Sequence, residues 1–161
     1  MARKKFRTLE QVLTNDFFLW PDEGINSDPG ESVRHRAIAE VLCSIPEDDY
    51  EKLKETFKKG YGWFIPPCFV KGLIQPFYAT VYPEEVKGTT LQSGPYVPVI
   101  YLSPILEETE WNIVLVVVAR EIAHVVLGHK LPGTEEEYKV QEVSVFDYVC
   151  KWGFEQGNIK L

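Results

Sequence analysis

The stretch Val114-Leu-Val-Val-Val-Ala-Arg-Glu-Ile-Ala-His-Val-Val-Leu-Gly-His129 decides how this chain folds. It is apolar almost throughout, and three residues interrupt it: Arg120, Glu121 and His124. Because successive residues of an α-helix are turned by about 100°, these three side chains share one polar stripe of a predicted helix. A helix that is apolar nearly all round belongs in the centre of a domain. Charged groups at such a place cost free energy unless they are paired or used in chemistry.

Length and composition indicate one globular domain over residues 1–161. Of the 161 residues 45% are hydrophobic, which is enough for a substantial core. The net charge of −7 argues against a nucleic-acid-binding surface. No secretory signal is apparent, and the apolar stretch is too short to span a membrane, so we expect no membrane partner. Cys43, Cys68 and Cys150 lack a CxxC spacing and suit reduced thiols, which predicts a cytoplasmic protein.

The first part of the chain is predicted to be helical. Apolar residues recur at helical spacing, which favours helices over Thr8–Leu19, Glu31–Ser44 and Pro46–Lys59. Thr8 can cap the first of these helices, and Gly60 can end the third.

Between residues 61 and 102 the pattern becomes typical of strands. Aromatic and β-branched residues broken by proline and glycine predict strands over Tyr61–Ile65, Val70–Ile74, Phe77–Tyr82 and Val97–Leu102. Glu84–Gly94 is interpreted as a polar connection. We therefore expect an α+β fold with N-terminal helices and a small, mostly antiparallel sheet.

The last part of the chain predicts two helices, the first of them central and buried. The β-branched run Val114–Val118 also suits a buried strand, but the length of the apolar stretch and its polar stripe favour a helix that Gly128 ends. Thr134, which precedes three glutamates, can cap a C-terminal helix that runs to Trp152 and stops at Gly153.

The polar stripe is similar to a metal-binding motif. Many zinc hydrolases carry H-E-x-x-H on a helix: the two histidines bind one metal, and the glutamate activates the metal-bound water. The corresponding residues here are Arg120-Glu-Ile-Ala-His124, with arginine in the first position.

The surrounding sequence resembles the zincin-like metallopeptidases, specifically the small cytosolic group with a ligand glutamate that includes phage- and mobile-element-associated immunity peptidases. In that group a strand similar to Val99-Ile-Tyr-Leu-Ser-Pro104 leads into a helix similar to Val117–His129. A later helix carries the ligand glutamate and ends in a Trp-Gly-Phe-like segment, and here Glu142 precedes Trp152-Gly-Phe154. The resemblance covers 98–154, and it implies a zincin-like fold.

The resemblance implies a role for each residue of the motif. Glu121 takes the position of the general base, His124 that of the second metal ligand and Glu142 that of the third. Arg120 stands where the first ligand histidine is expected. Arginine keeps its charge and has no lone pair for a metal. We expect Arg120 to replace the charge of the metal by pairing with Glu142, with Glu121 or with both.

An atypical metal site would need a further ligand, and His129 or His35 is the candidate for it. On a continuing helix His129 lies at about 140° from His124 and faces away from the stripe, so we expect it to interact with the end of the helix instead. His35 is interpreted as a surface residue of the second helix.

Three interpretations of the function follow from these residues. The first is a metallopeptidase homologue that has lost zinc and hydrolysis, needs no cofactor, and binds a peptide or protein along Val97–Leu102 as a regulatory module. The alternative is an active metal-dependent peptidase, with zinc held by His124, Glu142 and an atypical further ligand, and with Glu121 as base. A third interpretation treats the stripe as an ordinary salt-bridged seam in a structural or partner protein.

Overall fold

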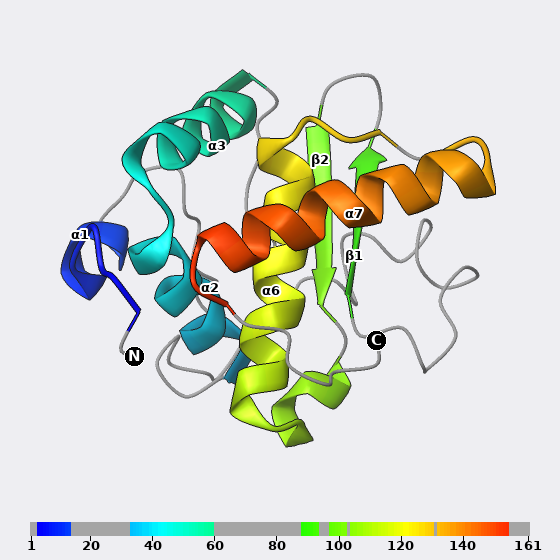
Figure 1. Cartoon of the computed structure of the whole chain (residues 1–161). Helices are drawn as coiled ribbons and strands as arrows, with labels where there is room; N and C mark the ends of the chain where they lie inside the picture. The colour runs from blue at the N-terminus through cyan, green and yellow to red at the C-terminus, as the bar shows by residue number, and fades with distance from the viewer. Residues whose placement is uncertain are drawn as a thin grey trace.

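The structure is a computed structural model that describes residues 3–13, 33–59, 88–93, 97–102, 104–130 and 132–154. In chain order its elements are α1 (Leu9–Leu13), α2 (Val33–Ser44), α3 (Glu47–Lys59), β1 (Gly88–Ser93), β2 (Val97–Leu102), the 3-10 helix η1 (Pro104–Glu108), α6 (Trp111–Val126) and α7 (Glu135–Lys151). Figure 1 shows α6 in the middle, with α7 crossing it in front and β2 behind.

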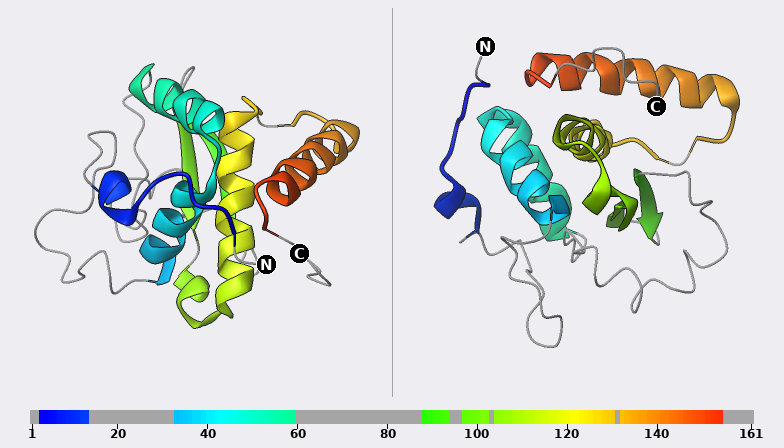
Figure 2. Two further views of the ribbon diagram at one scale, coloured as in Figure 1. Left: turned by 60° about the vertical axis from the view of Figure 1, so that its left-hand side comes forward. Right: turned by 90° about the horizontal axis from the view of Figure 1, so that it is seen from below.

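Helix α6 is the centre of the core, as its apolar sequence predicted. It begins at Trp111, earlier than the apolar run, and Val114–Ala119 are all buried. It packs against α2, α3, α7 and both strands. Figure 2 shows these neighbours as layers on different sides of α6, which explains why it is apolar nearly all round.

The second and third predicted helices are confirmed as α2 and α3. The predicted cap of the first helix is confirmed as well: the backbone N–H of Gln11 donates to Thr8 Oγ1 at 3.2 Å, and the backbone N–H of Thr8 donates to Gln11 Oε1 at 2.8 Å. This reciprocal pair is a capping box. Residues 14–19 of that predicted helix, and Gly60, lie outside the described residues.

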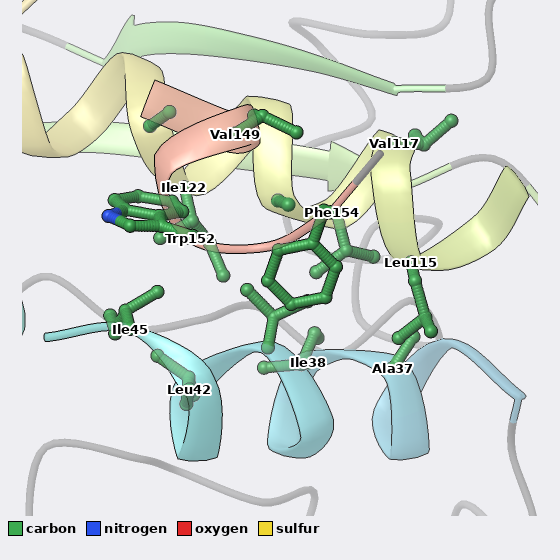
Figure 3. Close-up of a cluster of buried hydrophobic side chains, with 14 of the residues drawn as sticks. Ala37, Ile38, Leu42, Ile45, Leu115, Val117, Ile122, Val149, Trp152 and Phe154 are labelled. Atoms are coloured by element: carbon green, nitrogen blue, oxygen red, sulfur yellow. The ribbon is translucent and has the colours of Figure 1, made fainter. Parts of the chain in front are cut away.

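The C-terminal end of α7 contributes buried side chains to the core between α7 and α2. Figure 3 shows the side chains of Trp152 and Phe154 between α7 and α2, facing Ile38 and Leu42. Trp152 and Phe154 are buried, so the Trp-Gly-Phe segment is a packing element that holds α7 against the N-terminal helices.

Both long C-terminal helices end as predicted, at a glycine with positive φ. Gly128 has φ 67° and Gly153 has φ 83°. After α6, the N–H of Gly128 donates to the carbonyl of Val125, and the N–H of His129 donates to that of His124, both at 3.0 Å. These two bonds define a Schellman motif, in which the left-handed residue reverses the chain.

One described segment differs from its sequence-based interpretation. Residues 88–93, within the predicted connection Glu84–Gly94, form β1, which pairs antiparallel with β2 from Gly88 opposite Leu102 to Ser93 opposite Val97. The ladder is made by backbone groups, so polar residues such as Thr89 and Thr90 can join it. The prediction of β2 is confirmed.

The predicted α+β fold class, with the zincin-like sheet it implied, is wrong. The described part of the chain is mostly helical. Its two strands form one ladder rather than a sheet layer, and the other predicted strands, at 61–65, 70–74 and 77–82, lie outside the described residues. The physical reason is that the core around α6 is built chiefly from helices: α2, α3 and α7 cover most of its apolar surface, and the two strands contribute the rest.

None of the described helices is both long and apolar enough to cross a membrane.

Candidate functional site

Helices α6 and α7 bring three of the four motif residues together. Arg120 and His124 project from one face of α6 because they are four residues apart. Both contact Glu142 on α7. The guanidinium of Arg120 donates to Oε2 of Glu142, and Nε2 of His124 lies 3.2 Å from Oε1 of the same carboxylate. The predicted pairing of Arg120 with Glu142 is therefore confirmed.

The cluster is largely shielded from water. The side chains of Arg120, His124 and Glu142 are 17%, 14% and 22% exposed, so each contact is much less screened than a surface ion pair. Glu142 is positioned by its own helix, because Val145 and Val149, three and seven residues further on, are buried against the core.

Glu121 occupies the general-base position of the motif and is buried, with 5% of its surface exposed. It lies about 100° around α6 from Arg120, whereas His124 lies much closer to the direction of Arg120. The contacts to Glu142 come from Arg120 and His124.

His129 joins the cluster, contrary to the prediction that it faces away. The prediction assumed a continuing helix, but α6 ends at Val126 and the chain reverses at Gly128. As a result, Nδ1 of His129 lies 3.0 Å from Nδ1 of His124. The Schellman motif explains this contact, because it sets the residue after the glycine beside the residue five positions earlier. The Leu-Gly-His sequence carried that signal.

The carboxylate of Glu142 sets the direction of the two hydrogen bonds that it receives from Arg120 and His124. Glu142 as a carboxylate only accepts, so Nε2 of His124 carries the proton that faces it. Nδ1 of His124 and Nδ1 of His129 are within hydrogen-bond distance, so one of the two rings donates to the other, and the tautomers set which one.

The surroundings shift the pKa values of two residues in this cluster, Glu142 and His129. Burial alone would raise the pKa of the Glu142 carboxyl, but the hydrogen bond to His124 and the charge of Arg120 outweigh burial and hold it below its ordinary value. The pKa of His129 is lowered, first by burial and then by His124, while Glu142 acts in the opposite direction. Both shifts favour a charged Glu142 and a neutral His129.

The residues do not fit the zinc that the family resemblance implies. The 3.2 Å between His124 Nε2 and Glu142 Oε1 is close to the separation of two ligands on one tetrahedral zinc. Arg120, however, holds the other carboxylate oxygen. A dication about 4 Å from a guanidinium is opposed by roughly 8 kcal/mol at an effective dielectric constant of about 20.

The other histidines do not restore a ligand set. His129 approaches Nδ1 of His124, on the opposite side of that ring from Glu142. Among the described residues, no three or more His, Cys, Asp or Glu side chains are grouped so as to hold a metal ion. The side chain of His35 lies outside the described residues.

In comparisons with protein-family models, curated proteins and solved structures, nothing matches this chain. The resemblance to zincin-like metallopeptidases therefore depends on the motif residues and their spacing alone.

Proposed function

We propose that this chain is a metal-free relative of the zincin-like metallopeptidases that binds a peptide or protein without hydrolysing it. The observation that carries the proposal is the ion pair between Arg120 and Glu142, with His124 on the second carboxylate oxygen. These residues stand at three of the motif positions. Their charges satisfy one another without a metal.

Charge balance supports this proposal. In a metal site the dication compensates the ligand carboxylate, and without it Glu142 would be a buried anion lacking a counter-charge. The guanidinium supplies that charge permanently, since arginine does not deprotonate in proteins. Arg120 thus keeps α6 and α7 in contact and takes the place of the metal ion that would activate water.

Strand β2 is the proposed binding element. Among the described residues β2 pairs with β1 alone. A peptide in an extended conformation can add to a strand through backbone hydrogen bonds, which depend little on the sequence of the peptide. We place the partner along Val97–Leu102, as the sequence predicted.

Metal analysis of purified full-length protein tests the loss of zinc. We expect wild-type protein equilibrated with zinc and desalted to hold much less than one equivalent. We expect Arg120→His to gain zinc, because it restores a ligand and removes the fixed charge. Arg120→Lys is the matched control, since it keeps the charge and should gain none. The double variant Arg120→His, Glu142→Gln should lose the gained zinc. A stoichiometric metal in wild-type protein bound through His124 and Glu142 would overturn the proposal.

Incubation with unfolded casein tests the two functions against each other. We expect no cleavage by the wild type, with or without a chelator, and protection of backbone amides in 97–102 from hydrogen exchange when casein is present. Cleavage that a chelator abolishes and that Glu121→Gln removes would establish the active peptidase instead.

A further inference from the structure

The outward face of α7 carries an apolar patch. Val140, Val143 and Phe146 are 66%, 64% and 47% exposed, whereas Val145 and Val149 on the opposite side of the helix are buried. Their spacing of three residues sets the exposed side chains on one face. Figure 2 shows α7 as the outermost layer on its side of the molecule, so this face points away from the core. We call Val140, Val143 and Phe146 the outer patch.

Charges of opposite sign are arranged symmetrically around the outer patch. Lys139 lies four residues before Val143, and Asp147 lies four residues after it. Further out, the acidic turn Glu135–Glu137 begins the helix and Lys151 ends it. Reversing the helix about Val143 therefore exchanges positions of opposite charge.

From this symmetry we infer that the outer patch binds the outer patch of a second copy of this chain. In an antiparallel pair of α7 helices with a twofold axis at Val143, residues equally far from Val143 lie opposite one another. Val143 then meets its own counterpart, and Val140 meets Phe146 of the second copy. The apolar side chains that are exposed in one copy are buried at the centre of the interface.

The charges select a second copy over an unrelated partner. In the same arrangement Lys139 lies opposite Asp147 of the other copy, and the acidic first turn lies beside Lys151. The two helix dipoles are antiparallel, which adds to the attraction. An unrelated partner would need no such symmetry about the middle of the helix. The outer patch is exposed, whereas the carboxylate of Glu142 is bound by Arg120 and His124 of α6, so the interface does not depend on the proposed loss of metal.

Sedimentation equilibrium of the full chain tests the interface. We expect a dimer in the micromolar range, and we expect Val143→Asp to raise its dissociation constant about tenfold or more, because two carboxylates are buried on the axis. Ile105→Asp is the matched control: Ile105 is 48% exposed on η1, outside the outer patch. A wild type that stays monomeric up to about 100 µM, far above a micromolar dissociation constant, contradicts the inference.

A charge exchange tests the orientation of the two helices. Lys139→Glu and Asp147→Lys should each weaken the dimer, since each sets like charges opposite one another. The double variant should recover most of the wild-type association. A double variant as weak as the two single variants combined rules out the antiparallel arrangement.

Cross-linking tests the position of the axis and does not depend on affinity. In a Cys150→Ser background, Val143→Cys should form an intermolecular disulfide with itself on mild oxidation. Tyr138→Cys is the control, because Tyr138 is 50% exposed on the same helix but lies away from the outer patch. Equal cross-linking at both positions shows random collision and overturns the inference.

Discussion

Glu142 is the residue on which the candidate site depends, because Arg120 and His124 of α6 bind the two oxygens of its carboxylate. Arg120 supplies a permanent charge and His124 a hydrogen bond. A largely buried carboxylate with these partners is stable as an anion. The same carboxylate without Arg120 would keep its burial and lose its counter-charge.

Arg120→Met should therefore destabilise the fold by about 1–3 kcal/mol, since it keeps most of the volume and removes the cation. Urea unfolding followed by circular dichroism measures the change. Adding Glu142→Gln should recover part of the loss, because the amide needs no counter-charge. If Arg120→Met changes the free energy of unfolding by less than about 0.5 kcal/mol, the ion pair between Arg120 and Glu142 does not stabilise the fold.

Stability should fall as the pH decreases below 6.5, with His129 as one cause. Its folded pKa is lowered from 6.5, so below pH 6.5 the unfolded chain takes up a proton that the folded chain does not. This contribution is complete above pH 6.5 and is lost as the pH falls through the folded pKa. Urea unfolding at a series of pH values gives the free energy of unfolding of wild type and of His129→Gln. The slope of this free energy against pH should differ between the two proteins below pH 6.5, and equal slopes would contradict the role of His129.

Glu142 affects the stability of the fold at lower pH than His129 does. Its folded pKa is lowered from 4.5, so its stabilising contribution is present above pH 4.5 and is lost as the pH falls below that value. The difference in unfolding free energy between wild type and Glu142→Gln, measured from pH 6 to acid, should shrink below about pH 4.5. A difference that stays constant through this range would show that Glu142 is not held as an anion by its partners.

The end of α6 determines where His129 lies. A helix that continued past Val126 would carry His129 to the far side of the axis, whereas the left-handed Gly128 returns it to His124. The same motif ends α7, where the backbone N–H of Phe154 donates to the carbonyl of Val149. One backbone motif thus brings two histidine rings together at one helix end and precedes a buried phenylalanine at the other.

Gly128→Ala should cost about 1–2 kcal/mol, because a β-carbon is disfavoured at positive φ. Steric crowding adds nothing, since no atom lies within 4 Å of the added β-carbon. Gly128→Asn should cost less, because asparagine tolerates this conformation. Thermal unfolding measures both variants, and a neutral Gly128→Ala would show that the helix end adapts without the left-handed residue.

Contacts between distant parts of the chain hold the helices together as one molecule. The indole N–H of Trp152 donates to Oδ2 of Asp49 at 2.9 Å, and this bond joins the end of α7 to α3 across 103 positions in the sequence. Asp49 is 4% exposed. A buried carboxylate that loses this donor costs free energy. The bond therefore favours the observed packing of the end of α7 against α3.

Trp152→Phe should destabilise the protein by about 1–3 kcal/mol beyond the loss of packing area, because Asp49 loses a hydrogen bond in a buried place. Asp49→Asn is the comparison, since its amide oxygen still accepts from the indole and should cost about 1 kcal/mol or less. Unfolding in urea distinguishes the two variants. Equal costs would show that the charge of Asp49, rather than the bond, matters.

Local signals in the sequence were sufficient for the helices and their ends. The helical spacing of apolar residues located α2, α3, α6 and α7, and Thr8, Thr134, Gly128 and Gly153 were identified as caps. Capping and periodicity act within one or two turns of chain, so they can be recognised without knowing what the helix packs against. The polar stripe of α6 was recognisable for the same reason.

Tertiary structure decided the contacts that no local rule contains. The hydrogen bond from Trp152 to Asp49 joins two helices whose residues are 103 positions apart. The ladder of β1 depended on the backbone of β2 rather than on its own polar side chains. The described chain is mostly helical, in place of the expected sheet, because α2, α3 and α7 supply most of the surface that buries α6. Contacts between elements depend on which surfaces meet in the folded chain, and periodicity within one segment does not carry that information.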